Sequence, residues 1–151
     1  MMTVSDRGRA MGVDFGEARI GIALSDPTWT LATPHTVVAS KDKGAQIALV
    51  AGLIAEHGVT TVVVGMPYML DGSVGRMAEM VGKYVEKLAR TTGVNIITRD
   101  ERLTSWEAEQ RIREGGGRRK KKQSRQAQKG RIDMAAATIL LQNYLDAEPA
   151  P

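Results

Sequence analysis

Two short segments near the start of the chain, residues 11–16 and 20–25, constrain its fold more than any other feature, because apolar residues alternate in them with small or polar ones. A period of two places every second side chain on the same face of an extended strand, so both segments are predicted to be strands. The residues between them, 16–19, have the composition of a turn, and the pair therefore predicts a β-hairpin. Asp14 then lies on the strand face that glycine keeps open.

The following residues predict a third strand and then an alternation of helices and strands. An apolar stretch at 31–38 contains Pro34, which cannot donate to a ladder and therefore favours an edge strand. Further along, apolar residues at spacings of three and four predict amphipathic helices, and short runs of valine and isoleucine predict buried parallel strands. The helices are expected between 44 and 58 and between 77 and 93, and the strands at 62–64 and 94–97.

The last third of the sequence is organised around a strongly basic segment. Residues 104–107 have the spacing of a capping box, which predicts a helix to about residue 113. The stretch 115–131 holds eight basic residues and no acidic one, so we expect a self-repelling, mobile basic loop at 115–130. A final helix is expected from about residue 132.

Length and composition exclude several classes of protein. The 151 residues, 42% of them hydrophobic, suit one domain with a core at about 11–145. With no apolar run of membrane-spanning length and no signal-peptide pattern at the start, we expect a cytoplasmic protein without membrane association. The absence of cysteine excludes disulfides, thiolate nucleophiles and iron–sulfur clusters. The net charge of +4 is weak evidence for a polyanionic partner.

Three acidic residues stand at the ends of predicted elements: Asp14 on the first strand, Glu101 just after the fifth, and Asp133 at the start of the last helix. Ligands of open sheets gather outside the carboxyl ends of parallel strands, so these side chains are candidates for one site. Clustered carboxylates repel one another unless a cation neutralises them, and hard oxygen ligands suit Mg²⁺ or Mn²⁺. A cationic loop beside such a cluster would hold a phosphodiester against it, as in a nuclease.

Each carboxylate also has a purely structural interpretation. Asp14 fits a hairpin, Glu101 fits an exposed ion-pair cluster with Arg99 and Arg102, and Asp133 fits the capping of a helix N-terminus. The histidines, His35 and His57, are far apart in sequence and are assigned no role, and Ser25 has no convincing base for hydrolase chemistry.

Four ordered segments of the sequence read MGVDFGEARIGIALSD at 11–26, VGMP at 64–67 followed by DG at 71–72, DERLT at 100–104, and RIDMAAA at 131–137. Together these segments resemble the bacterial YqgF/RuvX family of pre-16S rRNA nucleases. The resemblance implies an RNase H-like α/β fold related to the RuvC resolvases, with a five-stranded mixed sheet in the order βββαβαβα and helices on both faces. Periodicity independently gives the same order of elements.

The resemblance also implies a catalytic and metal-binding set of Asp14, Glu101 and Asp133, with Asp100 next to it. Resolvases similar to RuvC carry their second carboxylate after the fourth strand, where this chain has Gly65–Pro67, so Glu101 takes that place. Two Mg²⁺ or Mn²⁺ ions are implied, which activate a water and stabilise the leaving oxygen. The nucleic-acid-binding candidates are all basic: Arg19, Arg102, Arg118, Arg119, Lys120, Lys121, Lys122, Arg125 and Lys129.

The function implied is metal-dependent cleavage of phosphodiester bonds in 5′-end maturation of pre-16S rRNA, within ribosome biogenesis. The alternative is a Holliday junction resolvase acting on branched DNA with the same site. A resolvase is expected to be a symmetric homodimer, whereas the RNA nuclease is compatible with a monomer. A non-catalytic RNA-binding assembly factor would bind without divalent metal. Actin-like ATP-binding folds need two lobes, for which the chain is too short.

Overall fold

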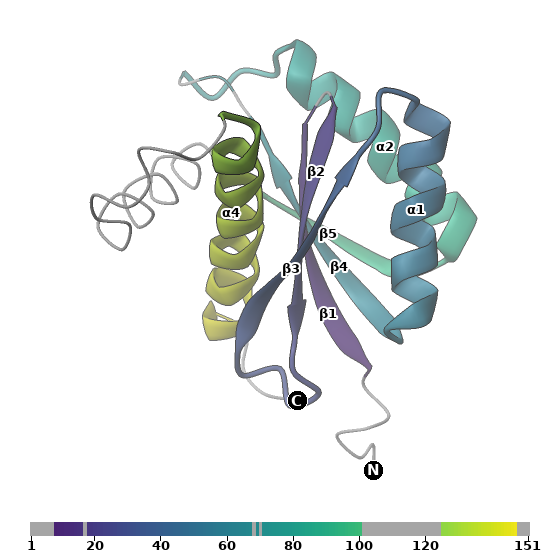
Figure 1. Cartoon of the computed structure of the whole chain (residues 1–151), viewed down its shortest axis with the longest axis vertical. Helices are drawn as coiled ribbons and strands as arrows, with labels where there is room; N and C mark the ends of the chain where they lie inside the picture. The colour runs from purple at the N-terminus through teal and green to yellow at the C-terminus, as the bar shows by residue number, and fades with distance from the viewer. Residues whose placement is uncertain (1–7, 17, 68, 70, 101–124, 148–151) are drawn as a thin grey trace.

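A five-stranded mixed sheet in the order β3-β2-β1-β4-β5 forms the centre of the molecule, with helices on both of its faces (Figure 1). The computed structural model describes residues 8–16, 18–67, 69, 71–100 and 125–147. The fold class expected from the sequence is therefore confirmed, since these residues follow the order βββαβαβ and end in a helix.

The first three strands form an antiparallel meander. β1 (Arg9–Phe15) pairs with β2 (Arg19–Ser25), and β2 pairs with β3 (Ala32–Ala39). Pro34 lies in β3 at the edge of the sheet, beside a register shift in β2, where a missing donor breaks no central ladder. The predicted hairpin and edge strand are both confirmed.

The other two strands are parallel to β1, and each follows a helix. α1 (Lys43–Glu56) leads into β4 (Val59–Met66), and α2 (Arg76–Thr92) leads into β5 (Asn95–Asp100). Asp42 caps α1 by accepting a hydrogen bond from the Ala45 N–H at 3.0 Å. Gly93 ends α2 in the left-handed conformation, with φ of 70°, which glycine adopts without steric cost.

The larger hydrophobic core lies between the sheet and the helices α1 and α2. The Phe15 and Tyr84 rings stack there with their centroids 4.9 Å apart. Burial raises the pKa of Tyr84, whose hydroxyl donates to the buried Oε1 of Gln46 at 2.7 Å. Most buried members from the strands alternate with the residues of the other face, as the period of two requires, and these include Met11, Val13, Phe15, Ile20, Ile22, Leu24, Val62 and Val64.

The opposite face of the sheet is covered by α4 (Arg125–Ala147), the green-to-yellow helix of Figure 1. Its apolar residues form a second core with small side chains of the sheet: Ala10, Ala23, Ala32, Val63, Ala137, Leu140, Leu141, Tyr144 and Leu145. Gly12 allows the close approach, because a Cβ on it would lie 2.5 Å from the Ala137 carbonyl oxygen.

One boundary differs from the sequence prediction. α4 begins at Arg125 and not near residue 132, so 125–130 belong to a helix and not to the predicted basic loop. Arginine, glutamine, alanine and lysine are good helix formers, and they extend a helix that the packed residues farther along already stabilise. The rest of that loop, 115–124, and the helix predicted from 104 lie outside the described residues. None of the described helices combines the length and apolar character that a membrane span requires.

Candidate active site at the carboxyl ends of the central strands

The carboxyl ends of β1, β4 and β5 meet at one edge of the sheet. Val13 pairs with Val64 and Met66 pairs with Asp100, so the ends of the three parallel strands lie side by side. Asp14 lies at this edge as the second-to-last residue of β1, and Asp100 ends β5. The carboxyl ends of the parallel strands are the place at which the sequence predicts the carboxylate site.

Strand alternation assigns Asp14 to the face covered by α4. Ala10 belongs to the core beneath α4, and residues 12 and 14 follow it at steps of two. On β5, Ile97 packs against the same core, and Arg99 places its guanidinium carbon 5.3 Å from the centre of the Tyr144 ring of α4. Asp14 and Arg99 therefore belong to one face of one edge.

Glycine keeps the space around Asp14 clear. Gly21 of β2 is the cross-strand partner of Asp14, so no side chain stands beside the carboxylate in that direction. Gly65 of β4 follows Val64, the partner of Val13, and carries no side chain either. Asp14 is half-buried on the face of the sheet that α4 covers.

The direction of α4 is opposite to that of β1. Ala137 lies against Gly12, whereas Gln142 accepts a hydrogen bond from the Ala32 N–H at 2.8 Å. Ala32 pairs with the end of β2, beside the start of β1. The helix therefore runs from the Asp14 edge of the sheet toward the far edge, as Figure 1 shows.

This register brings the backbone of Asp133 level with Asp14. Asp133 precedes Ala137 by four residues, which is about 6 Å along a helix axis. Asp14 follows Gly12 by two residues, which is about 6.7 Å along a strand. Because Ala137 lies against Gly12, the two steps lead to the same height on facing elements. The sequence prediction that a helix would carry Asp133 across this edge is thus supported by the backbone.

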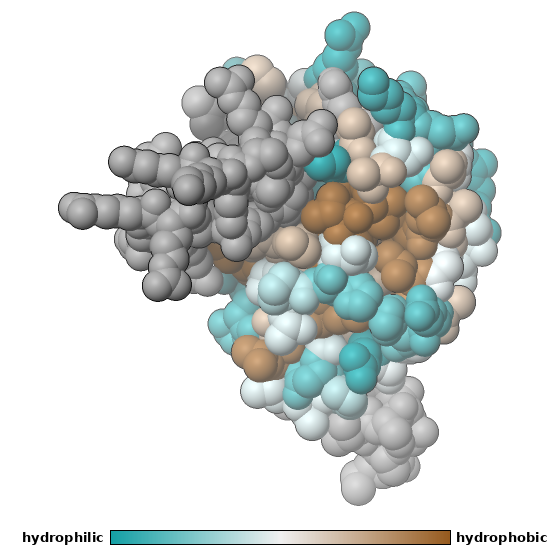
Figure 2. Space-filling model, viewed as in Figure 1, coloured by the Kyte–Doolittle hydropathy of each residue, from teal (hydrophilic) through white to brown (hydrophobic). Residues whose placement is uncertain are grey.

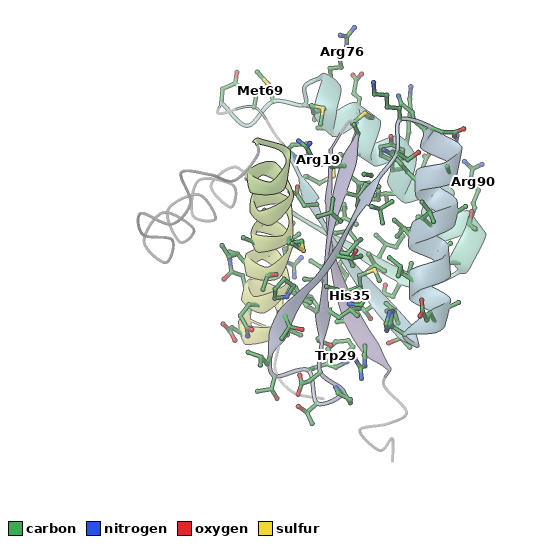
Figure 3. All side chains as sticks on the ribbon, in the orientation of Figure 1. Arg19, Trp29, His35, Met69, Arg76 and Arg90 are labelled. Carbon is green, nitrogen blue, oxygen red and sulfur yellow. The ribbon has the colours of Figure 1, made fainter. Side chains whose placement is uncertain are left out.

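The remaining predicted site residues are only partly placed. Glu101, Arg102 and the basic run 118–122 lie outside the described residues. Arg19 starts β2 at the same edge, where its carbonyl accepts from the Gly16 N–H at 2.8 Å (Figure 3). Arg125 and Lys129 lie in the first two turns of α4. The described side chains alone contain no group of three or more potential metal ligands, so the complete ligand set stays a prediction.

The histidines form a pair that sequence reasoning missed. The rings of His35 on β3 and His57 at the end of α1 meet edge to face, with centroids 4.6 Å apart. Partial burial and the neighbouring His57 lower the pKa of His35, and Glu56 opposes this shift. No local spacing could reveal the pair, because it depends on how α1 packs against the edge strand.

Two solved structures with a similar fold are described in complex with Holliday junction DNA. The chain superimposes with a TM-score of 0.58 on Thermus thermophilus RuvC in complex with a Holliday junction substrate, over 93% of this chain and 94% of that one, at 16% identity. For the fowlpox virus resolvase bound to Holliday junction DNA the TM-score is 0.55, over 92% and 97%, at 14% identity. At such identities the likeness establishes the fold alone.

Relatives in sequence are far more similar and match end to end. A protein named "Putative pre-16S rRNA nuclease" from Anaeromyxobacter sp. (strain Fw109-5) is 42% identical over 94% of this chain and 99% of its own length. A protein of the same name from Roseiflexus sp. (strain RS-1) is 38% identical over 95% and 98%. The family profile described as "RuvX: Holliday junction resolvase" matches residues 8–147. The chain belongs to the RuvX family.

Proposed function

We propose that this protein is a divalent-metal-dependent nuclease that cleaves phosphodiester bonds of precursor 16S rRNA. The observation that carries the proposal is the register of α4 on β1, which brings the backbone of Asp133 level with Asp14 at a glycine-lined edge. Carboxylates on neighbouring elements repel one another unless a cation neutralises them, so Asp14 and Asp133 would suit a hard divalent cation. The names of the full-length relatives support the substrate.

The residues present fit Mg²⁺ or Mn²⁺ better than softer metals. The chain has no cysteine, and its histidine pair lies on β3 and at the end of α1, away from this edge. Asp14, Glu101 and Asp133 would hold the metal, and Glu101 directly follows the last residue of β5. When bound, such ions lower the pKa of an attacking water and stabilise the charge of a leaving oxygen.

The protein itself contributes position and charge. Asp14 stands on the central strand β1, where it pairs with Gly21 of β2 and its neighbour Val13 pairs with Val64 of β4, so the sheet fixes the position of its backbone. Gly21 and Gly65 leave space for the nucleic-acid backbone to approach. Arg19 supplies positive charge at the same edge, and positive charge attracts phosphates regardless of sequence.

A Holliday junction resolvase is the second candidate, because the description of the matching family profile names that activity. The same carboxylates would cut either backbone, so only the substrate separates the two functions. Direct comparison settles it: a labelled RNA spanning the 5′ end of precursor 16S rRNA, an unrelated RNA, a duplex and a four-way DNA junction are incubated with Mg²⁺, Mn²⁺ or chelator at one salt concentration.

The expected result is metal-dependent cleavage of the precursor RNA at a defined position, with the junction left intact. Paired, symmetric cuts in the junction by a dimeric protein would instead establish the resolvase. Tight RNA binding that is unchanged by chelator, without any cleavage, would replace the nuclease with a non-catalytic RNA-binding factor.

A further inference from the structure

A second cationic site lies on the other face of the sheet, between the starts of α1 and α2. A pocket of about 480 Å³ is present there, lined by Lys43 of α1 and by five residues of α2: Arg76, Met77, Glu79, Met80 and Lys83. The two methionines are half-buried and form its apolar part, while the charged side chains are exposed. We call it the α1–α2 pocket.

The charge of the α1–α2 pocket is predominantly positive and uncompensated. Three of its side chains are cationic and one is anionic. Among the described residues none of the three cations takes part in an ion pair. Lys43 and Arg76 are moreover the first residues of their helices, where the helix dipole disfavours a positive charge. Local stability therefore does not explain these cations, whereas a bound anion would.

The α1–α2 pocket also lies at the edge of the sheet that carries Asp14. α1 follows β3 and α2 follows β4, and both strands run in the direction of β1. Figure 3 shows Arg76 and Arg19 at the same end of the molecule, and Figure 2 shows hydrophilic side chains gathered at that end. Asp14 faces α4, so the candidate active site and the pocket are on opposite faces of one edge.

We propose that the α1–α2 pocket binds a phosphodiester of the same nucleic-acid strand whose scissile phosphate lies at Asp14. The strand would cross the sheet edge and place a flanking phosphate between Lys43, Arg76 and Lys83. Lysine and arginine bind phosphates in this way without reading sequence, and the methionines offer polarisable surface to a sugar or base. The inference rests on the proposed nuclease function, because it uses that substrate.

The test replaces two cations of the pocket, one on α1 and one on α2, and compares this variant with one that replaces two cations farther along α2. The variant is Lys43→Gln with Arg76→Gln, and the control is Lys87→Gln with Arg90→Gln, which makes the same change in net charge. Arg90 is about 21 Å from Arg76 along α2, and neither control residue lines the pocket. Binding of labelled single-stranded RNA and DNA is titrated at several salt concentrations in chelator, and KM and kcat are measured separately with metal.

We expect the pocket variant to bind long RNA about tenfold more weakly, with a salt slope lower by roughly 0.7 for each lost phosphate contact. KM should rise while kcat stays unchanged, since the flanking phosphate takes no part in the chemical step. An RNA too short to reach beyond the scissile phosphate should show no difference between the proteins. If the pocket variant loses as much affinity for DNA as for RNA, the α1–α2 pocket contacts the sugar–phosphate backbone of the nucleic acid, as proposed.

Measurements of binding and of cleavage distinguish the pocket inference from the proposed nuclease function. If the parent protein cleaves RNA but the pocket variant binds as the control does, the pocket inference is wrong and the nuclease stands. If no substrate is cleaved but the pocket variant alone loses affinity for long strands, the pocket binds phosphate and the nuclease function is wrong. Equal affinity losses for short and long RNA would also overturn the pocket inference.

Discussion

At the scale of single residues, Asp14 is the position where a small chemical change should have the largest effect. Replacing it by asparagine keeps the volume but removes an anionic ligand, so metal-dependent cleavage should fall by roughly two orders of magnitude or more. The main chain around it is held by two strand partners and should remain folded. Cleavage rates with Mg²⁺ and Mn²⁺, together with thermal unfolding, provide the measurement.

The matched control removes a carboxylate from the far edge of the sheet. The control variant is Glu56→Gln. Glu56 ends α1 and its side chain is 69% exposed, so the cleavage rate of this variant should equal that of the parent. If Asp14→Asn cleaves as fast as this control at saturating metal, Asp14 is a hairpin residue and not a metal ligand.

The histidine pair should make stability depend on pH. Because burial and His57 lower the pKa of His35 below its ordinary value of 6.5, the unfolded chain binds the proton more readily than the folded one. The free energy of unfolding should therefore decrease as the pH falls through about 6.5. His35→Gln should flatten this dependence between pH 7 and 5 in chemical unfolding experiments, and an unchanged pH profile in that variant would contradict the assignment.

At the scale of elements, the packing of α4 against β1 determines whether Asp14 and Asp133 can belong to one site. A Cβ at Gly12 would lie 2.5 Å from the Ala137 carbonyl oxygen and 2.8 Å from the Leu141 Cβ, so α4 must move outward. Gly12→Ala should cost about 1–3 kcal/mol of stability, as overpacking does. It should also reduce cleavage, because the facing positions of Asp14 and Asp133 would shift apart.

Gly82→Ala in α2 is the control for Gly12→Ala, because it adds the same methyl group at a position where that group meets open space. A Cβ at Gly82 meets nothing within 4 Å, and alanine is the better helix former, so the variant should gain up to about 1 kcal/mol. Urea unfolding of the two variants beside the parent gives both values. Parent-like stability of Gly12→Ala would mean that α4 does not pack on β1 as described.

Elements whose burial follows a local period could be predicted from the sequence. The alternation at 11–16 and 20–25 predicted β1 and β2, and the three valines at 62–64 predicted the buried strand β4. The start of α4 at Arg125 differs from the prediction of about residue 132, because residues 125–129 combine high positive charge, which favours a loop, with good helix propensity, which prevails. The histidine pair and the α1–α2 pocket depend on packing between distant elements, which no local pattern encodes.

At the scale of the whole molecule, one edge of the sheet collects both signs of charge. Asp14 and Asp100 lie at this edge, and the described backbone continues beyond it in α4, which begins at Arg125. The α1–α2 pocket adds cations on the opposite face. A polyanion would thus be attracted to this edge, and the proposed carboxylate site would confine cleavage to one point of it.

Replacing the basic run by serine tests how much of the binding depends on it. The substitutions are Arg118→Ser, Arg119→Ser, Lys120→Ser, Lys121→Ser and Lys122→Ser. Each lost phosphate contact should lower the slope of log affinity against log salt by roughly 0.7 for a single strand. Because a segment of like charges contributes little to a core, the free energy of unfolding should remain near that of the parent.

Titration of labelled RNA at several salt concentrations measures the slope, and single-turnover cleavage shows whether the chemical step changes. If the run only attracts and positions the strand, KM should rise and kcat should stay constant. The α1–α2 pocket should still contribute to RNA affinity in the serine variant. Adding Lys43→Gln and Arg76→Gln to that variant should therefore weaken RNA binding further. The two losses of affinity should be nearly additive, because the two sites lie on different elements. Salt slopes equal to those of the parent would show that residues 118–122 remain solvated and contact no phosphate.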